Sequence, residues 1–248
     1  MVNEQMAHDS APRQSTRIQT SLLNAVEKKA LVWMASRMPQ WVTSDMLTWF
    51  GLFGSALCGF GFFLTHYSIY WLWLSCLGLV INWFGDSLDG TLARVRNTRR
   101  PLYGYYLDHN IDTVNEAFMF IGAGLSPLIN LGVALLCYAA YLALTVYVSI
   151  NAHLKSEFKL TYGKLGPTEF RLIIVIANIL LMYVPALTAY QGSFEFYGET
   201  IHYGSLDIIG IGILAILCVF YFVSFFKDLR WFAQKDPLNG HVVFRKKN

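Results

Sequence analysis

Four aspartates within 27 residues are the side chains of this sequence best suited to chemistry. Asp86 and Asp89 lie three residues apart, and Asp108 and Asp112 lie four residues apart. Each pair forms a stripe if its segment is helical, because helical residues three or four apart share a face. Clustered carboxylates repel one another unless a cation lies between them. Mg²⁺ and Mn²⁺ prefer carboxylate oxygens, and two such ions suit phosphoryl chemistry because they hold the attacking and leaving oxygens. We therefore expect a site for one or two Mg²⁺ or Mn²⁺ ions.

Both acidic stripes lie in segments apolar enough for a bilayer. Of the 248 residues, 55% are hydrophobic and only 14% are charged, whereas a soluble domain carries about 25% charged residues. A charged side chain at bilayer depth is costly and therefore indicates function. The composition predicts an all-α, polytopic membrane protein.

The placement of basic residues predicts the topology. The 19 Lys and Arg fall in four blocks, at residues 13–37, 94–100, 155–171 and 227–247. The three stretches between them contain neither residue type: 38–93, 101–154 and 172–226. Each stretch is long enough for two helices of about 20 residues. If every basic block is cytoplasmic, as the positive-inside rule requires, the chain has six transmembrane helices. Both termini and the acidic site then face the cytoplasm. If the protein is bacterial, the expected membrane is the inner membrane.

These boundaries define the expected parts of the chain. The spans are expected at 46–66, 69–93, 102–125, 129–153, 168–188 and 206–226, with an outer loop at 189–205. Ser44 or Asp45 is the expected N-cap of the first span, and Pro101 the expected first-turn residue of the third. We expect a disordered cytoplasmic tail at 1–20, a juxtamembrane helix at 21–38, the six-helix membrane domain at 39–230 and a basic cytoplasmic tail at 231–248.

The segment 21–38 has the pattern of an amphipathic helix in the cytoplasmic membrane interface. Its apolar positions lie near one helical face: Leu22, Leu23, Val26, Ala30, Leu31, Met34 and Met38. Glu27, Lys28 and Arg37 lie elsewhere. The alternative is a short soluble helix that packs on the membrane domain.

A phosphorylated ligand fits the surroundings of the aspartates. The loop between the two acidic helices is short, so these helices are expected to be antiparallel neighbours with facing stripes near the cytoplasmic end. Gly90 and Gly104 have no side chains, so a bulky ligand could approach the backbone there. Arg94, with Arg96, Arg99 and Arg100, supplies positive charge for a diphosphate. Arg96 and Arg99 are better explained as anchors of the helix end at the membrane surface, and the same role is the alternative for Arg94.

The types and spacing of these residues resemble the signature of a known protein family. Asp-x-x-Asp-Gly-x-x-Ala-Arg, nine residues, then Gly-x-x-x-Asp-x-x-x-Asp, over residues 86–112, resembles the complete signature of the class I CDP-alcohol phosphotransferases (CDP-alcohol phosphatidyltransferases), which are integral membrane enzymes. Residues 41–48 also resemble the family's approach to its first span, except that Ser44 stands where proline is common. The resemblance covers roughly residues 20–230.

The resemblance implies a reaction and roles for individual residues. An alcohol hydroxyl attacks a CDP-linked donor, a phosphodiester forms and CMP leaves. One metal ion would be held by Asp86, Asp89 and Asp108, and the second by Asp86, Asp108 and Asp112. Asp112 would also be the general base. The CDP site would be lined by Gly90, Ala93, Arg94 and Gly104, with Arg100, Asp45 and Thr48 nearby.

The resemblance leaves the substrates open. The segment 166–169, Gly-Pro-Thr-Glu, resembles a string in choline and ethanolamine phosphotransferases, although Thr168 could simply cap the fifth span. Lys164 and Arg171 could instead bind an anionic acceptor, and the chain is shorter than the eukaryotic aminoalcohol enzymes. We therefore favour CDP-diacylglycerol as donor, with CDP-choline or CDP-ethanolamine and a diacylglycerol-like acceptor as the alternative. The acceptor-site candidates are Glu116, Lys164, Glu169 and Arg171.

Two other functions compete with phospholipid synthesis. A divalent-cation or proton transporter would also bury aspartates, but the third span beyond Glu116 reads AFMFIGAGL and offers no polar path. An inactive scaffold is disfavoured because every signature position is present. The expected partners are the donor, the acceptor, membrane lipid and, by family resemblance, a second copy of the chain. No nucleic-acid partner is expected.

Overall fold

The computed structural model describes residues 16–18, 24–155, 157–159 and 167–237, which are mostly helical. The α-helices are α2 (Asn24–Arg37), α3 (Ser44–Phe63), α4 (Leu72–Val95), α5 (Pro101–Gly124), α6 (Leu131–Lys155), α7 (Pro167–Tyr183), α8 (Pro185–Ala189) and α9 (Ser205–Lys235). Two short 3-10 helices, η1 (Leu64–His66) and η2 (Ile69–Trp71), join α3 to α4. The strands are β1 (Thr16–Ile18), β2 (Glu157–Lys159), β3 (Gln191–Phe196) and β4 (Glu199–Gly204).

A helix occupies the position of each span expected from the sequence, namely α3, α4, α5, α6, α7 and α9. Among the described residues, three helical segments are long and apolar enough to cross a membrane: Ser44–His66, Leu131–Lys155 and Ser205–Lys235. Two of the other helices, α4 and α5, each carry two of the four aspartates, and α7 has only 17 residues. The three apolar helices indicate an integral membrane protein.

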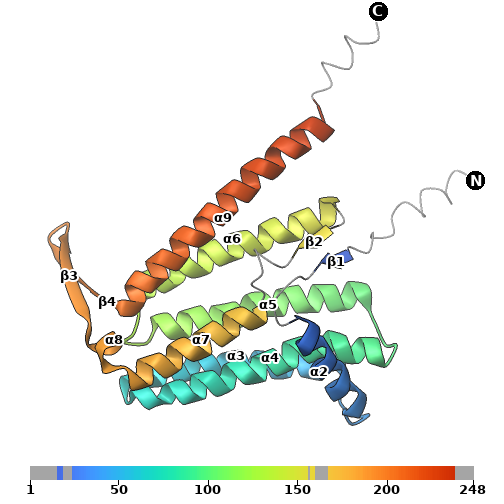
Figure 1. Cartoon of the computed structure of the whole chain (residues 1–248), viewed down its shortest axis with the longest axis horizontal. Helices are drawn as coiled ribbons and strands as arrows, with labels where there is room; N and C mark the ends of the chain where they lie inside the picture. The colour runs from blue at the N-terminus through green and yellow to red at the C-terminus, as the bar shows by residue number, and fades with distance from the viewer. Residues whose placement is uncertain (1–15, 19–23, 156, 160–166, 238–248) are drawn as a thin grey trace, which may run out of the picture.

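Helices α3, α4, α5 and α7 form a bundle with α2 at one end and the β3–β4 hairpin near the other (Figure 1). Contacts join α3 to α4 and α5, α4 to α7, α5 to α6, and α6 to α9. Helix α9 diverges from the bundle along its length (Figure 1). The connection between α4 and α5 lies at the end of the bundle where α2 packs (Figure 1).

Close packing at glycines lets α3 approach both aspartate-bearing helices. A Cβ atom on Gly85 of α4 would overlap the carbonyl oxygen of Leu47, and one on Gly122 of α5 would overlap the backbone of Gly59. Any larger residue would push these helices apart. Helix α3 therefore sets the spacing of α4 and α5 although it contributes none of the four aspartates.

A buried hydrogen-bonded layer links the same three helices. The Ser55 hydroxyl of α3 donates to Asn115 Oδ1 of α5 at 2.8 Å and accepts from Asn82 Nδ2 of α4 at 2.9 Å. Ser55 and Asn82 are fully buried. Asn82 precedes Asp86 by one helical turn, and Asn115 follows Asp112 by three residues. The layer thus fixes α4 and α5 within about one turn of their carboxylates.

Helix α2 packs on the bundle through a face that only partly matches the expected one. Its inward side chains are Glu27, Leu31, Met34, Ala35 and Met38, and they contact Trp83, Leu88 and Leu92 of α4. Val26 is 71% exposed, while Leu22 and Leu23 lie outside the described residues. Glu27 was expected away from the apolar face, yet it lies on the inward face, because the hydrophobic pattern does not show that a carboxylate can find donors on α4 and α7.

Two N-terminal details also differ from the sequence expectation. Thr43, rather than Ser44 or Asp45, caps α3, since its hydroxyl accepts from Met46 N at 3.2 Å. Ser44 instead donates to the carbonyl oxygen of Asp89 at 2.9 Å. Pro101 does begin α5, as predicted.

The structure adds strands that an all-α fold does not include. The expected outer loop at 189–205 forms the antiparallel β3–β4 hairpin, whose Tyr197–Gly198 turn has positive φ at both residues, as tight hairpin turns require. Strands β1 and β2 pair in parallel, so residues 16–18 are not simply part of an irregular tail. Helix α9 continues to Lys235, past the boundary expected at 230.

Candidate metal and active site

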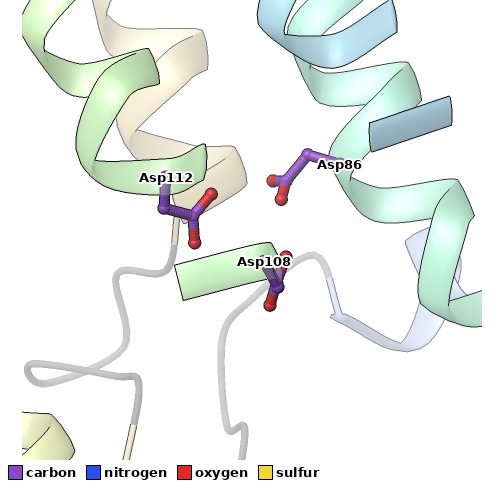
Figure 2. A group of neighbouring side chains, drawn as sticks. All are labelled: Asp86, Asp108 and Asp112. Carbon is purple, nitrogen blue, oxygen red and sulfur yellow. The ribbon is translucent and has the colours of Figure 1, made fainter. Parts of the chain in front are cut away.

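Three of the four aspartates converge between α4 and α5. Asp86 extends from α4, and Asp108 and Asp112 extend from α5 toward it (Figure 2). One carboxylate oxygen from each lies within 4.8 Å of the others, and all three side chains are half-buried. Mg²⁺ and Ca²⁺ bind oxygens at about 2.0–2.6 Å, so this spacing fits three ligands around one divalent ion. The strict four-residue spacing of the α5 pair explains why both point to the same side.

Asp89 lies outside this group among the described residues. It is only 8% exposed, and its Oδ2 accepts from the Thr48 hydroxyl of α3 at 2.6 Å. Its Oδ1 accepts from the backbone N–H of Gly90. Thr48 therefore holds the Asp89 carboxylate toward α3.

A cation from a third helix reaches the acidic group. Arg171 Nη2 of α7 lies 2.6 Å from Asp86 Oδ2, and the two side chains are 16% and 23% exposed. Such a short, shielded pair is strong because little water screens it. Arg171 was expected near the acceptor, and the structure brings it to the aspartates. Lys164 lies outside the described residues.

The space beside the two signature glycines is open. A Cβ added to Gly90 or Gly104 would meet nothing within 4 Å, and both residues are exposed. Ala93 is half-buried, and exposed Arg94 donates to Thr91 Oγ1 at 2.8 Å. A ligand can therefore approach the α4 and α5 backbones here, as the sequence predicts.

Asp45 and Arg100 meet at the start of α3 and α5. Arg100 Nη2 lies 2.9 Å from Asp45 Oδ2, and the Tyr103 hydroxyl donates to the same oxygen at 3.1 Å. The Arg100 guanidinium also covers the Tyr103 ring, 3.6 Å from its centroid. These side chains form an exposed polar cluster where α3 and α5 begin.

Glu116 continues the α5 stripe deeper into the bundle. Its Oε2 is buried and has no hydrogen-bond partner among the described residues. Glu116 interacts electrostatically with Arg171 and Asp86, and Tyr141 of α6 interacts with the same charges and with Asp112. Tyr141 cannot be recognised from the sequence, since a tyrosine within an apolar run carries no distinctive signal.

The start of α7 contains the buried acid Glu169 and a hydrogen bond from Thr168 to α2 that the sequence does not predict. Glu169 is 6% exposed. Thr168 does not cap α7, because the helix already begins at Pro167 and the Thr168 hydroxyl donates to Glu27 Oε1 of α2 at 2.7 Å.

Comparison with known proteins identifies the family. The family model described as CDP-alcohol phosphatidyltransferase matches residues 41–206. The chain belongs to this family. The resemblance carried by the signature is thereby confirmed. The matched stretch of this CDP-alcohol phosphatidyltransferase family member contains all four aspartates and Arg171, whereas α2 precedes it.

Individual relatives of this family member differ in their names. Cholinephosphotransferase 1 of Bos taurus is 26% identical over 166 residues, which cover 64% of this chain and 41% of that protein. The Gallus gallus protein of the same name is 25% identical over 192 residues, covering 75% and 55%. Phosphatidylinositol phosphate synthase of Cutibacterium acnes (strain DSM 16379 / KPA171202) is 34% identical over 84 residues, covering 34% and 38%. The matches thus span about two fifths to just over half of these relatives.

Proposed function

We propose that this protein transfers a substituted phosphate group from a CDP-linked donor to an alcohol hydroxyl, releasing CMP in phospholipid synthesis. The observation that carries the proposal is the convergence of Asp86, Asp108 and Asp112. Family membership supports the same reaction class. Family membership does not favour a cation or proton transporter.

The aspartates would hold Mg²⁺ or Mn²⁺, in a two-ion arrangement that includes Asp89 as a ligand. When bound, the ions supply neutralising charge for the donor diphosphate. Asp112 is the proposed general base, because a positioned carboxylate can take the proton from an attacking hydroxyl. The acceptor oxygen bonds to the phosphorus distal to cytidine while the bridging P–O bond breaks. CMP leaves with that electron pair.

The donor would lie along the open glycine side. Gly90 and Gly104 leave room for it, and Arg94 supplies charge to its phosphates. Ala93 borders this space, while Thr48 steadies Asp89 next to it. Asp45 and Arg100 would contact the outer part of the nucleotide.

CDP-diacylglycerol is the donor that we favour, with an anionic soluble acceptor. Arg171 is the proposed contact for an anionic acceptor because it lies beside the aspartates, and Lys164 and Glu169 complete the proposed acceptor side. The unpaired Glu116 oxygen is suited to an acceptor hydroxyl. The phosphatidylinositol phosphate synthase match is consistent with this choice.

A CDP-choline or CDP-ethanolamine donor with a lipid acceptor is the second candidate. One observation favours it: the cholinephosphotransferase matches cover 64% and 75% of this chain, against 34% for the phosphatidylinositol phosphate synthase. Thr168 belongs to the segment that resembles the aminoalcohol enzymes. Its hydroxyl donates to Glu27 of α2 and does not cap α7.

The proposed setting is a six-span homodimer with its termini and active site in the cytoplasm and α2 in the membrane interface. The placement of the basic blocks supports the orientation. The dimer rests on family resemblance. Exposed Val26 and Trp33 on the outer side of α2 are suited to lipid contact.

The test is a donor and acceptor screen with purified protein in lipid nanodiscs, measuring CMP release with Mg²⁺ or Mn²⁺. CDP-diacylglycerol is combined with glycerol phosphate, serine, inositol or inositol phosphate, and CDP-choline or CDP-ethanolamine with diacylglycerol. We expect metal-dependent CMP release from a CDP-diacylglycerol pair. Release only with the aminoalcohol donors would support the second candidate, and no release from any pair would overturn the reaction class.

A further inference from the structure

Glu27 of α2 connects two helices of the active site through one oxygen atom. Its Oε1 accepts from Trp83 Nε1 of α4 at 2.8 Å and from Thr168 Oγ1 of α7 at 2.7 Å. A carboxylate oxygen can accept two such bonds at once. Glu27 therefore fixes the separation of α4 and α7 at this level.

The Asp86–Arg171 pair joins the same two helices one turn away. Trp83 precedes Asp86 by three residues on α4, and Thr168 precedes Arg171 by three residues on α7. Residues at this spacing lie on the same side of a helix, about 4.5 Å apart along its axis. The Glu27 hydrogen bonds and the Asp86–Arg171 ion pair therefore lie one turn apart along the interface between α4 and α7.

Helix α2 is packed firmly on α4, so the backbone at Glu27 is held in place. Leu31 and Ala35 are buried in a cluster with Leu88 and Leu92 of α4. In the connection that follows α2, the Arg96 guanidinium donates to the carbonyl oxygens of Met38 at 2.9 Å, Pro39 at 2.8 Å and Val42. Because these contacts hold α2 in place, the two hydrogen bonds of Glu27 can position the start of α7.

We propose that Glu27 is a positioning residue that holds the first turns of α7 so that Arg171 meets Asp86. This inference rests on the proposed function for its effect on catalysis, although the positioning itself does not require that function. Glu27 contacts neither the aspartates nor the open glycine side directly. It acts through Thr168, Trp83 and the helices that carry them. The segment that contains it lies outside the residues matched by the family model.

The chemistry of the contact provides a matched pair of variants. Glu27→Ala removes both hydrogen bonds. Glu27→Gln keeps an oxygen of nearly the same position that can accept from both donors, so it rescues a positioning role without the charge. Lys29→Ala changes an exposed residue of the same helix and is the control for α2 itself.

The experiment uses the full chain in nanodiscs and two readouts. The first is amide hydrogen exchange over residues 171–175, the turn that contains Arg171. The second is the CMP release rate in the wild type, Glu27→Ala, Glu27→Gln, Lys29→Ala, Arg171→Ala and the double variant Glu27→Ala/Arg171→Ala. We expect Glu27→Ala to speed exchange and slow CMP release by about tenfold each, the lower end of the effect of losing an outer-shell partner. Glu27→Gln and Lys29→Ala should resemble the wild type.

The double variant distinguishes positioning through Arg171 from an independent effect. If Glu27 acts through Arg171, the double variant releases CMP no more slowly than Arg171→Ala, because effects on one linked unit do not add. Wild-type exchange in Glu27→Ala, or additive losses in the double variant, would overturn the inference. If the wild type releases no CMP, the proposed function fails while the exchange readout still decides the positioning role.

Discussion

Arg171 Nη2 lies 2.6 Å from Asp86 Oδ2, so α7 supplies a cation to acids that α4 and α5 bring together. The pair occupies one oxygen of a proposed metal ligand and leaves Asp108 and Asp112 beside it. Arg171 is therefore part of the charge balance of the cluster and not only a membrane-surface anchor.

The first prediction concerns this charge balance. Arg171→Ala should destabilise the metal-free protein by about 3 kcal/mol, the scale for removing one partner of a buried ion pair. Added Mn²⁺ should restore part of that loss because it replaces the missing positive charge. Thermal unfolding with EDTA and with Mn²⁺ measures both effects, and exposed Arg99→Ala is the control. An equal loss of stability in both conditions would contradict the charge-balance role.

The second prediction concerns metal binding. Mn²⁺ at about 100 times its dissociation constant should stabilise the wild type by about 2.7 kcal/mol. Asp108→Asn should lose most of this gain, because it removes one of three converging carboxylates. Calorimetric titration with Mn²⁺ provides the direct measurement. Glu195→Gln in the exposed β3–β4 hairpin should bind as the wild type does, and retained affinity in Asp108→Asn would argue against the site.

The third prediction compares two glycines with opposite surroundings. Gly104→Leu adds a side chain to open space, so the protein should fold normally while the KM for the CDP-linked donor rises at least about tenfold. Gly85→Ala should lower the free energy of unfolding by about 1–3 kcal/mol because its Cβ overlaps the α3 backbone. Donor kinetics and thermal unfolding separate these outcomes. A stable, catalytically normal Gly104→Leu variant would remove the glycine side from the donor site.

The fourth prediction concerns the layer beneath the aspartates. Ser55→Ala should lower the free energy of unfolding by about 1–3 kcal/mol, since it leaves Asn115 Oδ1 and Asn82 Nδ2 without their shared partner. Ser36→Ala on the exposed side of α2 should change stability far less. Denaturant unfolding in detergent measures the difference. Equal stability losses in the two variants would show that the layer does not stabilise the bundle.

The helices and the acidic stripes could be predicted from the sequence because both depend on local periodicity. Apolar length and the spacing of basic residues located six helical segments, and four-residue spacing placed Asp108 and Asp112 on one face. The turn of Asp89 toward Thr48 could not be predicted in this way. It depends on how α4 is rotated against α3, which the buried glycines decide only once the helices pack.

Polar contacts between residues far apart in the chain were the main features that the sequence could not predict. Arg171 lies 85 residues from Asp86, and Thr168 lies 141 residues from Glu27. Nothing in either local pattern specifies these contacts, since a basic residue near a helix start and an acid on a surface helix are both ordinary. The sequence predicts only an outer loop at 189–205 and not the β3–β4 hairpin, although Tyr197–Gly198 provides a tight turn.

In the proposed reaction the three aspartates support metal-dependent attack on a CDP-linked donor, with Asp112 as the base. The most direct measurement is CMP release by purified wild-type and Asp112→Asn protein, with Mg²⁺ or Mn²⁺ and with EDTA. We expect CMP release to require metal and to fall by about 10²–10⁴-fold in Asp112→Asn, the range for losing a general base. CMP release at the wild-type rate by Asp112→Asn, or release that persists in EDTA, would contradict it.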